Sequence, residues 1–221
     1  SSVYCTTHYL YMAKLFLVRH GKSAWNELGL WTGHTDIDLN EIGIEEARRA
    51  GQALRGEVIH HAHVSPLRRT HQTLDEIKRV LELNELDTAI HHAIIERHYG
   101  VHTGKNKWQV RDEVGEEEFK KLRRGWDIAI PEGETLKDVY ARVVPYFEEH
   151  IKSALLQLRN VLVVAHGNSL RALVKHIENI HEDAIADVEL GTGEVHCYVF
   201  DETGAMTGKE VRASNENIGK I

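Results

Sequence analysis

The sequence predicts an α/β fold, a three-layer sandwich in which helices flank a mostly parallel central sheet. Short apolar segments alternate with stretches of helical periodicity, which is the pattern of parallel strands joined by crossover helices. The clearest strand, Asn160–Ala165, is continuously apolar rather than alternating, as expected for a strand that is covered on both faces. The chain has three prolines in 221 residues and no Ser- or Gly-rich tract, so a single domain is expected.

The N-terminal half begins with a β-prone run at Lys14–Val18. Apolar residues at helical spacing, separated by charges, predict a helix over Glu41–Leu54 and an amphipathic helix over Leu67–Leu83. Between these helices, Val58–Val64 is a weaker strand candidate because three histidines interrupt it. A further strand is predicted at Thr88–Ile95.

The C-terminal half begins with a highly charged helix that is predicted over Gln109–Arg124. A long helical pattern follows over Gly133–Leu158, and Pro145 is expected to kink it because proline has no backbone N–H to donate. After the apolar strand, a helix is predicted over Asn168–Asn179. The chain then forms a predicted hairpin of two strands, Glu194–Phe200 and Met206–Val211.

The domain is expected to span residues 13–221, with residues 1–12 as an extension outside it. Met12 stands directly before AKLFLVRHG. The residues before Met12 lack the basic region and the long apolar region of a secretory signal. They therefore contribute nothing to the fold prediction.

Composition and charge exclude several classes of protein. Lys and Arg number 27 against 34 Asp and Glu, a net charge of -7, whereas a bulk nucleic-acid binder is expected to be basic. There is no run of about 18 apolar residues, so no membrane-spanning helix is expected. Cys5 and Cys197 are far apart and form no CxxC pair, which excludes a disulfide framework and a zinc ribbon. Sparse cysteine and no clear signal peptide favour a cytoplasmic protein.

Two segments of the chain share one design. LFLVRHGKS and VLVVAHGNS each run from an apolar strand into His-Gly and then into a small polar residue. His20 and His166 are therefore expected just beyond the carboxyl ends of two strands, where ligands bind in open α/β sheets and helix N-termini favour anions. With Arg19 beside His20, the pair predicts a phosphate site built on two histidines.

A third segment, SPLRRT at residues 65–70, places Arg68 and Arg69 at the start of a helix. A cation at a helix N-terminus is opposed by the helix dipole, so this placement is better explained if an anion binds there. The alternative interpretation is a solvated pair of charges.

RHGKSAWN at 19–26 is followed by WTGHTDIDLNEIG at 31–43. These motifs resemble the histidine phosphatase superfamily and, more narrowly, its cofactor-dependent phosphoglycerate mutase branch. IERHYGVHTGKNK at 95–107 resembles the mutase branch, and three further motifs follow in the expected order: LRRGWD, PEGETLKD and VVAHGNSLRAL. Lys22 departs from the usual Glu or Gln and adds positive charge beside His20.

The resemblance implies a set of catalytic residues. A neutral imidazole is nucleophilic near pH 7, because its ordinary pKa is about 6.5, so His20 is expected to form a phosphohistidine. Glu96 is the expected general acid and base. Arg19, Arg69 and His166 are expected to hold the phosphoryl group.

The resemblance also implies a substrate-binding set in which cations bind the carboxylate of a three-carbon acid and neutral donors complete the pocket. This set is Ser23, Asn26, Thr32, Gly33, Arg97, Tyr99, Lys107, Arg123, Arg124, Gly167 and Asn168. Glu134 is expected to support the site or to cap a helix.

The implied activity is interconversion of 3-phosphoglycerate and 2-phosphoglycerate, a step of glycolysis and gluconeogenesis. The reaction would be primed by 2,3-bisphosphoglycerate and would need no metal. The expected partners are small phosphoglycerates, with no nucleic acid and no membrane, and a homo-oligomer is expected, with a dimer as the favoured state.

Alternative interpretations remain open at this point. A phosphatase of small phosphomonoesters on the same fold would keep the two histidines and the two phosphate-binding arginines. Glu96 could instead form a structural salt bridge with Arg97, and Arg123-Arg124 could be a solvated helix face. The histidines at 60, 61 and 63 and at 91 and 92, among sixteen in the chain, could make a metal-binding module.

Overall fold

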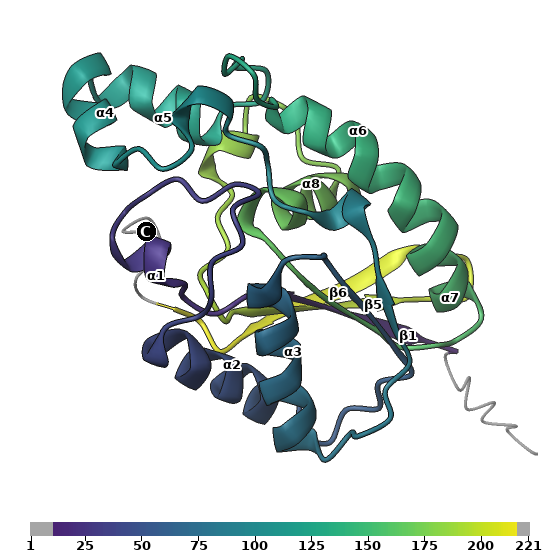
Figure 1. Ribbon diagram of the computed structural model, residues 1–221. Coiled ribbons are helices and arrows are strands. Elements are labelled where there is room, and N and C mark those ends of the chain that lie inside the picture. The colour runs from purple at the N-terminus through teal and green to yellow at the C-terminus, as the bar shows by residue number, and fades with distance from the viewer. Residues whose placement is uncertain (1–10, 216–221) are drawn as a thin grey trace, which may run out of the picture.

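The structure, a computed structural model, describes residues 11–215, so the expected extension lies almost wholly outside the described residues. These residues form a six-stranded sheet in the order β3-β2-β4-β1-β5-β6 (Figure 1). Strands β3, β2, β4 and β1 are parallel, whereas β5 and β6 run antiparallel as a hairpin. The strands are β1 Ala13–Arg19, β2 His61–Val64, β3 Thr88–Ile90, β4 Val161–Ala165, β5 Val195–Phe200 and β6 Met206–Arg212. The prediction of an α/β sandwich with a mostly parallel sheet is confirmed.

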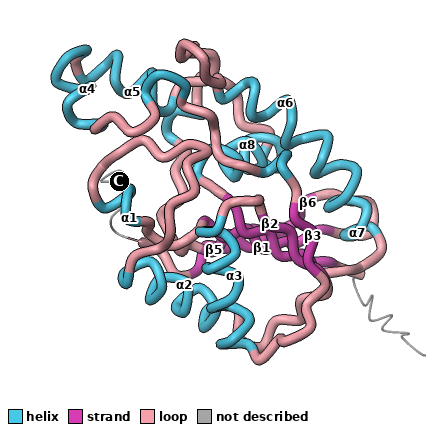
Figure 2. The backbone as a smooth tube through the Cα atoms, viewed as in Figure 1, coloured by secondary structure: helices cyan, strands magenta, loops and turns pink. Residues whose placement is uncertain are grey.

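Helices cover both faces of the sheet, and Figure 2 shows the strands between the two helical layers. One layer holds α2 (Glu41–Ala53) and α3 (Arg68–Leu81). The other holds α6 (Leu136–Tyr146), α7 (Ser153–Leu156) and α8 (Gly167–Glu178). The middle layer is therefore shielded from water on both sides, which explains why β4 is apolar at every position.

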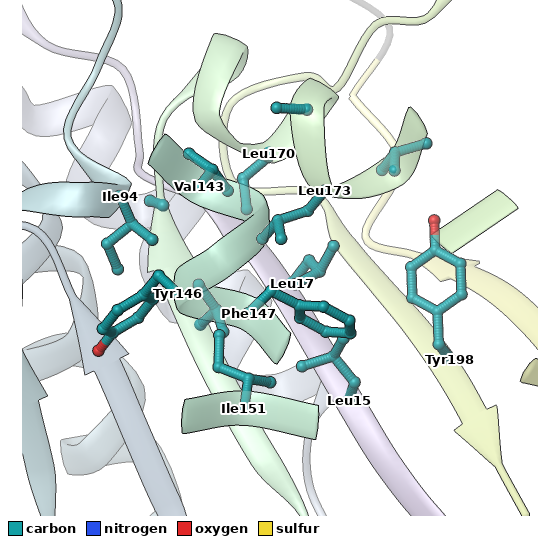
Figure 3. Close-up of a cluster of buried hydrophobic side chains, with 14 of the residues drawn as sticks. Leu15, Leu17, Ile94, Val143, Tyr146, Phe147, Ile151, Leu170, Leu173 and Tyr198 are labelled. Atoms are coloured by element: carbon teal, nitrogen blue, oxygen red, sulfur yellow. The ribbon is translucent and has the colours of Figure 1, made fainter. Parts of the chain in front are cut away.

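Each face of the sheet has its own hydrophobic core. Side chains alternate along a strand, so Leu15 and Leu17 of β1 pack against α6, α7 and α8, whereas Phe16 and Val18 pack against α2 and α3. Figure 3 shows the larger core, where Phe147 lies against the two leucines of β1. Such two-sided packing requires an apolar residue at consecutive positions of β1.

A third, smaller core lies under two helices that stand apart from the sheet, α4 (Lys107–Val114) and α5 (Glu116–Arg124) (Figure 1). Its members are Trp31, Tyr99, Val110, Phe119 and Ile130. The prediction of one helix over Gln109–Arg124 is wrong, because Gly115 has φ of 88° and the chain turns there. A positive φ costs glycine little, so this residue separates the two helices.

Other predicted boundaries also shift. The helix predicted over Gly133–Leu158 begins at Leu136, where Thr135 accepts a hydrogen bond from Asp138 N and so caps α6. Pro145 lies within α6, and a π-helical segment, Phe147–Lys152, follows before α7. β2 begins only at His61, and β3 ends at Ile90 before a short 3-10 helix at His92–Ile94. A short helix that the sequence did not predict, α1, covers Ala24–Glu27 and precedes α2.

In the part of the chain that the structure describes, no helix has both the length and the apolar character needed to cross a bilayer.

His63 on β2 is expected to make the fold sensitive to acid. The ring is buried, Nδ1 lies 2.6 Å from Tyr146 Oη, and burial, reinforced by His61 and His150, lowers the pKa of His63 to about 3. The ordinary pKa of a histidine is about 6.5, so between pH 6.5 and pH 3 the unfolded chain binds a proton that the folded chain does not. The free energy of unfolding therefore keeps its full value above pH 6.5 and decreases as the pH falls toward 3. The free energy of unfolding should fall by about 2 kcal/mol between pH 7.5 and pH 5 on this account.

Urea denaturation at these two pH values tests this expectation. The His63→Gln variant should lose this part of the pH dependence, whereas His181→Gln, at an exposed position, should keep it. An equal fall in stability for wild type and His63→Gln would contradict the assignment.

Candidate active site

The two histidines predicted at strand ends lie together. β1 and β4 are parallel neighbours in which Arg19 pairs with Ala165, so His20 and His166 leave the sheet side by side. Their ring centroids are 5.0 Å apart in an edge-on arrangement, and both side chains are buried. The position is the carboxyl edge of the parallel strands, where α/β sheets bind ligands.

The surroundings of His20 keep its imidazole ring neutral and fix its tautomer. Nδ1 lies 2.7 Å from Gly21 O, and because a carbonyl oxygen only accepts, Nδ1 carries the proton and Nε2 carries the lone pair. Burial, and then the positive charges of Arg69 and Arg19, hold the pKa of His20 well below its ordinary value. The imidazole ring is therefore neutral at pH 7 and its Nε2 is unprotonated, as nucleophilic attack requires.

The direction of this pKa shift predicts the pH profile. Phosphorylation of the unphosphorylated protein should slow only when the imidazole of His20 is protonated, so its second-order rate constant should still be on its plateau at pH 6.5 and fall at lower pH. The measurement is the rate at which the unphosphorylated protein gains the mass of a phosphoryl group from a phosphomonoester donor between pH 5 and pH 9, with recovery of that rate after return to pH 7.5 as the control for unfolding. An acid limb centred at or above pH 6.5 and assigned to His20 by NMR would contradict the structure.

His166 is fixed by a serine that sequence reasoning missed. His166 Nε2 lies 2.7 Å from Ser65 Oγ, while Nδ1 is buried and has no partner within residues 11–215. When Ser65 Oγ donates to Nε2, Nδ1 carries the proton and is available to a phosphoryl oxygen. Burial and the charge of Arg69 hold the pKa of His166 well below its usual range. Ser65 begins the SPLRRT segment, in which the sequence pattern predicted anion binding only for the arginines.

The two arginines of the predicted clamp are oriented by backbone oxygens, and Arg69 is buried while Arg19 is half-buried. Arg69 lies in the first turn of α3 and donates to Thr35 O and Gly33 O, both at 2.8 Å. Burial lowers the pKa of Arg69 to about 10, so the group remains charged at neutral pH. Arg19 donates to Leu190 O at 2.6 Å, and its Nε is buried without a partner in the described part of the chain.

The neighbouring Arg68 has a different role. It is exposed, and its Nε lies 3.1 Å from Asp38 Oδ1 at the surface. The alternative interpretation of a solvated charge therefore holds for Arg68 and not for Arg69.

Glu96 lies in the loop after the short 3-10 helix and turns its carboxylate into the site. Oε1 accepts hydrogen bonds from Arg97 N at 2.7 Å and Asn168 N at 3.2 Å. The backbone oxygen of Glu96 accepts from His34 Nε2 at 2.7 Å and Arg142 Nη2 at 3.1 Å. The loop is thus held from both sides, and the second carboxylate oxygen is left to face the pocket.

Glu134 supports this arrangement indirectly. Its carboxylate accepts from Arg142 Nη2 at 2.9 Å, and Arg142 also donates to the carbonyl oxygens of Ala93 and Ile95. Glu134 therefore orients a guanidinium group that holds the segment leading to Glu96.

A single pocket unites most of the predicted residues. Its lining comprises Arg19, His20, Asn26, Trp31, Thr32, Gly33, Arg69, Glu96, Tyr99, Lys107, Arg123, Arg124, Gly167 and Asn168. Among these residues five are cationic and one, Glu96, is a carboxylate. Burial, followed by the charges of Arg123, Arg19 and Arg124, holds the pKa of Lys107 well below its usual value. Such an excess of buried positive charge fits a ligand with several negative charges.

Two predicted binding residues, Arg97 and Ser23, lie outside this lining. Arg97 is fully buried, and its guanidinium donates to the carbonyl oxygens of Glu134, Leu122 and Ile128 instead of facing the pocket. Its guanidinium nitrogens are therefore held by backbone oxygens, and its contact with Glu96 is made through the backbone N–H. Ser23 caps α1, where Asn26 N donates to its Oγ at 3.1 Å.

Lys22, the departure from the family pattern, also lies outside the lining. Its Nζ is 3.0 Å from Glu27 Oε2. The added charge is thus paired with a carboxylate rather than directed at the phosphate end of the pocket.

Arg171 on α8 is a further residue that sequence reasoning missed. It is buried, and Nη1 donates to Asn168 Oδ1 at 2.9 Å while Nη2 donates to Arg124 O at 2.8 Å. Asn168 in turn donates to Tyr99 Oη at 2.7 Å. Arg171 therefore orients two pocket residues, and Arg124 is further paired with Glu189.

The histidine-rich segments are not arranged as a metal centre. Within residues 11–215 no three His, Cys, Asp or Glu side chains are grouped so that they could hold a metal ion. His60 accepts from Asn160 N, His61 contacts Asp87, and His91 stacks on Tyr146. These histidines have structural contacts.

The arrangement is suited to phosphoryl transfer. A neutral imidazole, two arginines and a carboxylate line one pocket, and the ring of a second histidine, His166, lies 5.0 Å from the ring of His20. Transfer of a phosphoryl group depends mainly on positioning and on stabilising charge on its oxygens, which these groups provide.

Comparison with known proteins agrees with this chemistry. The model of the histidine phosphatase superfamily (branch 1) matches residues 15–210. A 2,3-bisphosphoglycerate-dependent phosphoglycerate mutase of Treponema denticola is 38% identical over 232 residues, which cover 93% of this chain and 94% of that protein. A protein of the same name from Bartonella tribocorum is 40% identical over 199 residues, which cover 89% of this chain and 97% of that protein.

Solved structures show the same fold at lower identity. Bacillus stearothermophilus YhfR superposes with a TM-score of 0.77 at 22% identity, covering 88% of this chain and 94% of that chain. A mycobacterial glucosyl-3-phosphoglycerate phosphatase superposes with a TM-score of 0.76 at 20% identity, covering 90% and 97%. The chain belongs to the histidine phosphatase superfamily, branch 1, and within it to the family of 2,3-bisphosphoglycerate-dependent phosphoglycerate mutases.

Proposed function

We propose that this protein is a phosphoglycerate mutase that interconverts 3-phosphoglycerate and 2-phosphoglycerate through a phosphohistidine at His20. The observation that carries the proposal is the orientation of His20, whose Nδ1–H is bound by Gly21 O so that the unprotonated Nε2 is the nucleophile. Nε2 belongs to a pocket with five cations, which suits a ligand that carries both a phosphate and a carboxylate.

The phosphoryl transfer follows from the positions of the side chains. Nε2 of His20 attacks phosphorus, the N–P bond forms as the P–O bond to the ligand breaks, and Glu96 gives a proton to the leaving oxygen. Arg19, Arg69 and the Nδ1–H of His166 stabilise the charge on the equatorial oxygens. In reverse, Glu96 removes a proton from a ligand hydroxyl, and that oxygen takes the phosphoryl group from His20.

Isomerisation requires that His20 gives a phosphoryl group to one hydroxyl of the glycerate and takes a phosphoryl group from the other. His20 donates its phosphoryl group to the free hydroxyl of a monophosphoglycerate and, after the ligand turns in the pocket, accepts the other phosphoryl group. The cycle must begin with a phosphorylated His20, and 2,3-bisphosphoglycerate supplies that group when bound. The cations of the pocket suit so highly charged a primer, and the proposed steps route through no metal.

The glycerate end of the pocket supports a mutase over a simple phosphatase. Lys107 begins α4, and Arg123 and Arg124 end α5, so the two helices bring three cations to one side of the pocket. A phosphatase of small phosphomonoesters has no need to orient a carboxylate. The buried, unfavourably placed ammonium group of Lys107 is explained by an anionic ligand that compensates its charge.

The deciding experiment measures two products at once. The protein is assayed in EDTA for conversion of 3-phosphoglycerate to 2-phosphoglycerate, with and without 2,3-bisphosphoglycerate, while free phosphate is followed. Isomer formation that the primer stimulates, with little free phosphate, supports the mutase. Release of phosphate without isomer formation would instead identify a phosphatase of the same superfamily.

We further propose a cytoplasmic location and assembly as a homodimer. The location is supported by a sequence with only two cysteines, of which Cys197 is buried and unpaired. Fractionation would test the location, and sedimentation would test the assembly.

A further inference from the structure

We propose that the indole N–H of Trp31 is an additional substrate-binding group, which donates a hydrogen bond to the carboxylate of the bound phosphoglycerate. The inference rests on the proposed function, because it assigns one more contact to that substrate. It concerns a residue that the motifs place in WTGH but to which they assign no role.

The backbone places Trp31 beside the cations of the glycerate end. Trp31 N donates to Lys105 O at 3.1 Å, and Gly104 N donates to Trp31 O at 2.8 Å. The same pairing of two segments continues to Lys107, whose N donates to Gly29 O at 2.9 Å. Trp31 and Lys107 both line the pocket, and the pairing of their segments holds their backbones close together.

The indole donor of Trp31 is unsatisfied by the protein. The side chain is 1% exposed, and Nε1 has no hydrogen-bond partner within residues 11–215. A buried donor without an acceptor destabilises the fold, and native structures keep few such groups without a functional reason. Because Trp31 lines the cationic pocket, we assign a bound anion as the acceptor for this donor.

The aromatic neighbours of Trp31 do not serve as acceptors. Tyr99 and Phe119 lie with ring centroids 5.9 and 6.1 Å from the Trp31 ring, and they pack its faces and edges. His102 lies 5.3 Å away with an angle of 33° between the ring planes, and its own Nδ1 also lacks a partner in the described residues. Because neither Trp31 Nε1 nor His102 Nδ1 has a partner in these residues, no hydrogen bond joins the two rings.

The carboxylate, rather than the phosphate, is the group within reach. The reacting phosphorus must lie at His20, where Arg19 and Arg69 bind its oxygens. Lys107 is joined to Trp31 through the paired backbone, and the guanidinium of Arg123 lies 5.6 Å from the ring of Phe119, which packs on Trp31. Trp31 therefore belongs to the end of the pocket that holds the carboxylate.

The neutral indole N–H adds a directional contact, which an ammonium group lacks. An ammonium group such as that of Lys107 attracts an anion from any direction, whereas an indole N–H has one direction. A buried donor also penalises ligands that offer no acceptor, because the donor is then left unpaired. Trp31 would thus select phosphomonoesters that carry a carboxylate and fix how that carboxylate is oriented.

The test combines NMR with steady-state kinetics. The chain has four tryptophans, so the indole 15N–1H signals form a small set, and the Trp31 signal is identified by its loss in Trp31→Phe. The wild-type protein is titrated with 3-phosphoglycerate and, separately, with inorganic phosphate, which carries no carboxylate. Trp108→Phe is the matched control, because Trp108 packs in the same aromatic core but does not line the pocket.

The expected result is a shift of the Trp31 indole signal with 3-phosphoglycerate and none with inorganic phosphate. In Trp31→Phe, KM for 3-phosphoglycerate should rise about 10- to 100-fold with kcat nearly unchanged, as for a hydrogen bond to a charged group made equally in ground and transition states. Trp108→Phe should change KM by less than about twofold, within the range expected away from a binding contact.

Two results would overturn the inference. One is full wild-type turnover with an indole signal that does not move at saturating 3-phosphoglycerate. The other is a KM in Trp31→Phe that matches the Trp108→Phe control. Failure of the proposed function is distinguishable, because it would show as absence of isomer formation by the wild-type protein.

Discussion

Replacing His20 with asparagine is expected to abolish isomerisation, with kcat reduced by a factor of about 10⁴ or more. Asparagine removes the protein atom that bonds to phosphorus in the proposed cycle, the Nε2 of His20, and no other side chain of that cycle then takes over covalent transfer. The fold should persist, because an asparagine amide can still donate to Gly21 O. The measurement is the isomerisation rate together with intact mass after incubation with 2,3-bisphosphoglycerate.

The wild-type protein should gain the mass of one phosphoryl group in that incubation, and His20→Asn should gain none. His150→Asn, at a half-exposed position, is the control and should behave as wild type. A phosphorylated His20→Asn protein, or one that retains more than about a hundredth of the wild-type kcat, would contradict the assignment of His20 as nucleophile.

Replacing Glu96 with glutamine is expected to lower kcat by a factor of about 10² to 10⁴, the usual contribution of general acid–base catalysis. The amide oxygen can still accept from Arg97 N and Asn168 N, so the loop should keep its position. The amide cannot exchange a proton with the leaving oxygen. The loss should therefore appear in kcat for phosphoglycerate.

The nature of the leaving group gives a sharper measurement for Glu96. Phosphorylation of His20 by an aryl phosphate releases a phenolate that needs little protonation, so Glu96→Gln should slow this reaction far less than it slows the reaction with phosphoglycerate. Glu182→Gln, an exposed residue, is the control for a changed charge. Equal losses with both phosphoryl donors would show that Glu96 acts through structure rather than as an acid.

Local patterns in the sequence were sufficient for the architecture and for the centre of the site. The consecutive apolar residues of β1 and β4 predicted a sheet covered on both faces, because each residue of such a strand meets a separate core. The His-Gly that follows each strand predicted where His20 and His166 lie, because parallel neighbours end at the same edge. These inferences need only the regular geometry of strands.

Element boundaries were less predictable, since they depend on single residues. Gly115 separates α4 from α5, although the charge pattern continues across it. The N-terminal cap at Thr135 likewise makes α6 begin at Leu136 rather than at the predicted Gly133. A pattern averaged over a dozen residues does not register one backbone angle.

Tertiary structure alone decided which charged residues face the pocket. Arg97, Arg142 and Arg171 donate to backbone or amide oxygens of distant segments, whereas Arg123 and Arg124 line the pocket. In the sequence all five are cations near a motif. A buried guanidinium must satisfy its donors with whichever oxygens packing brings to it, and those oxygens lie far away along the chain. The sequence by itself therefore determined the fold class and the placement of the two histidines at strand ends, and the structure determined which arginines line the pocket and which hold its walls.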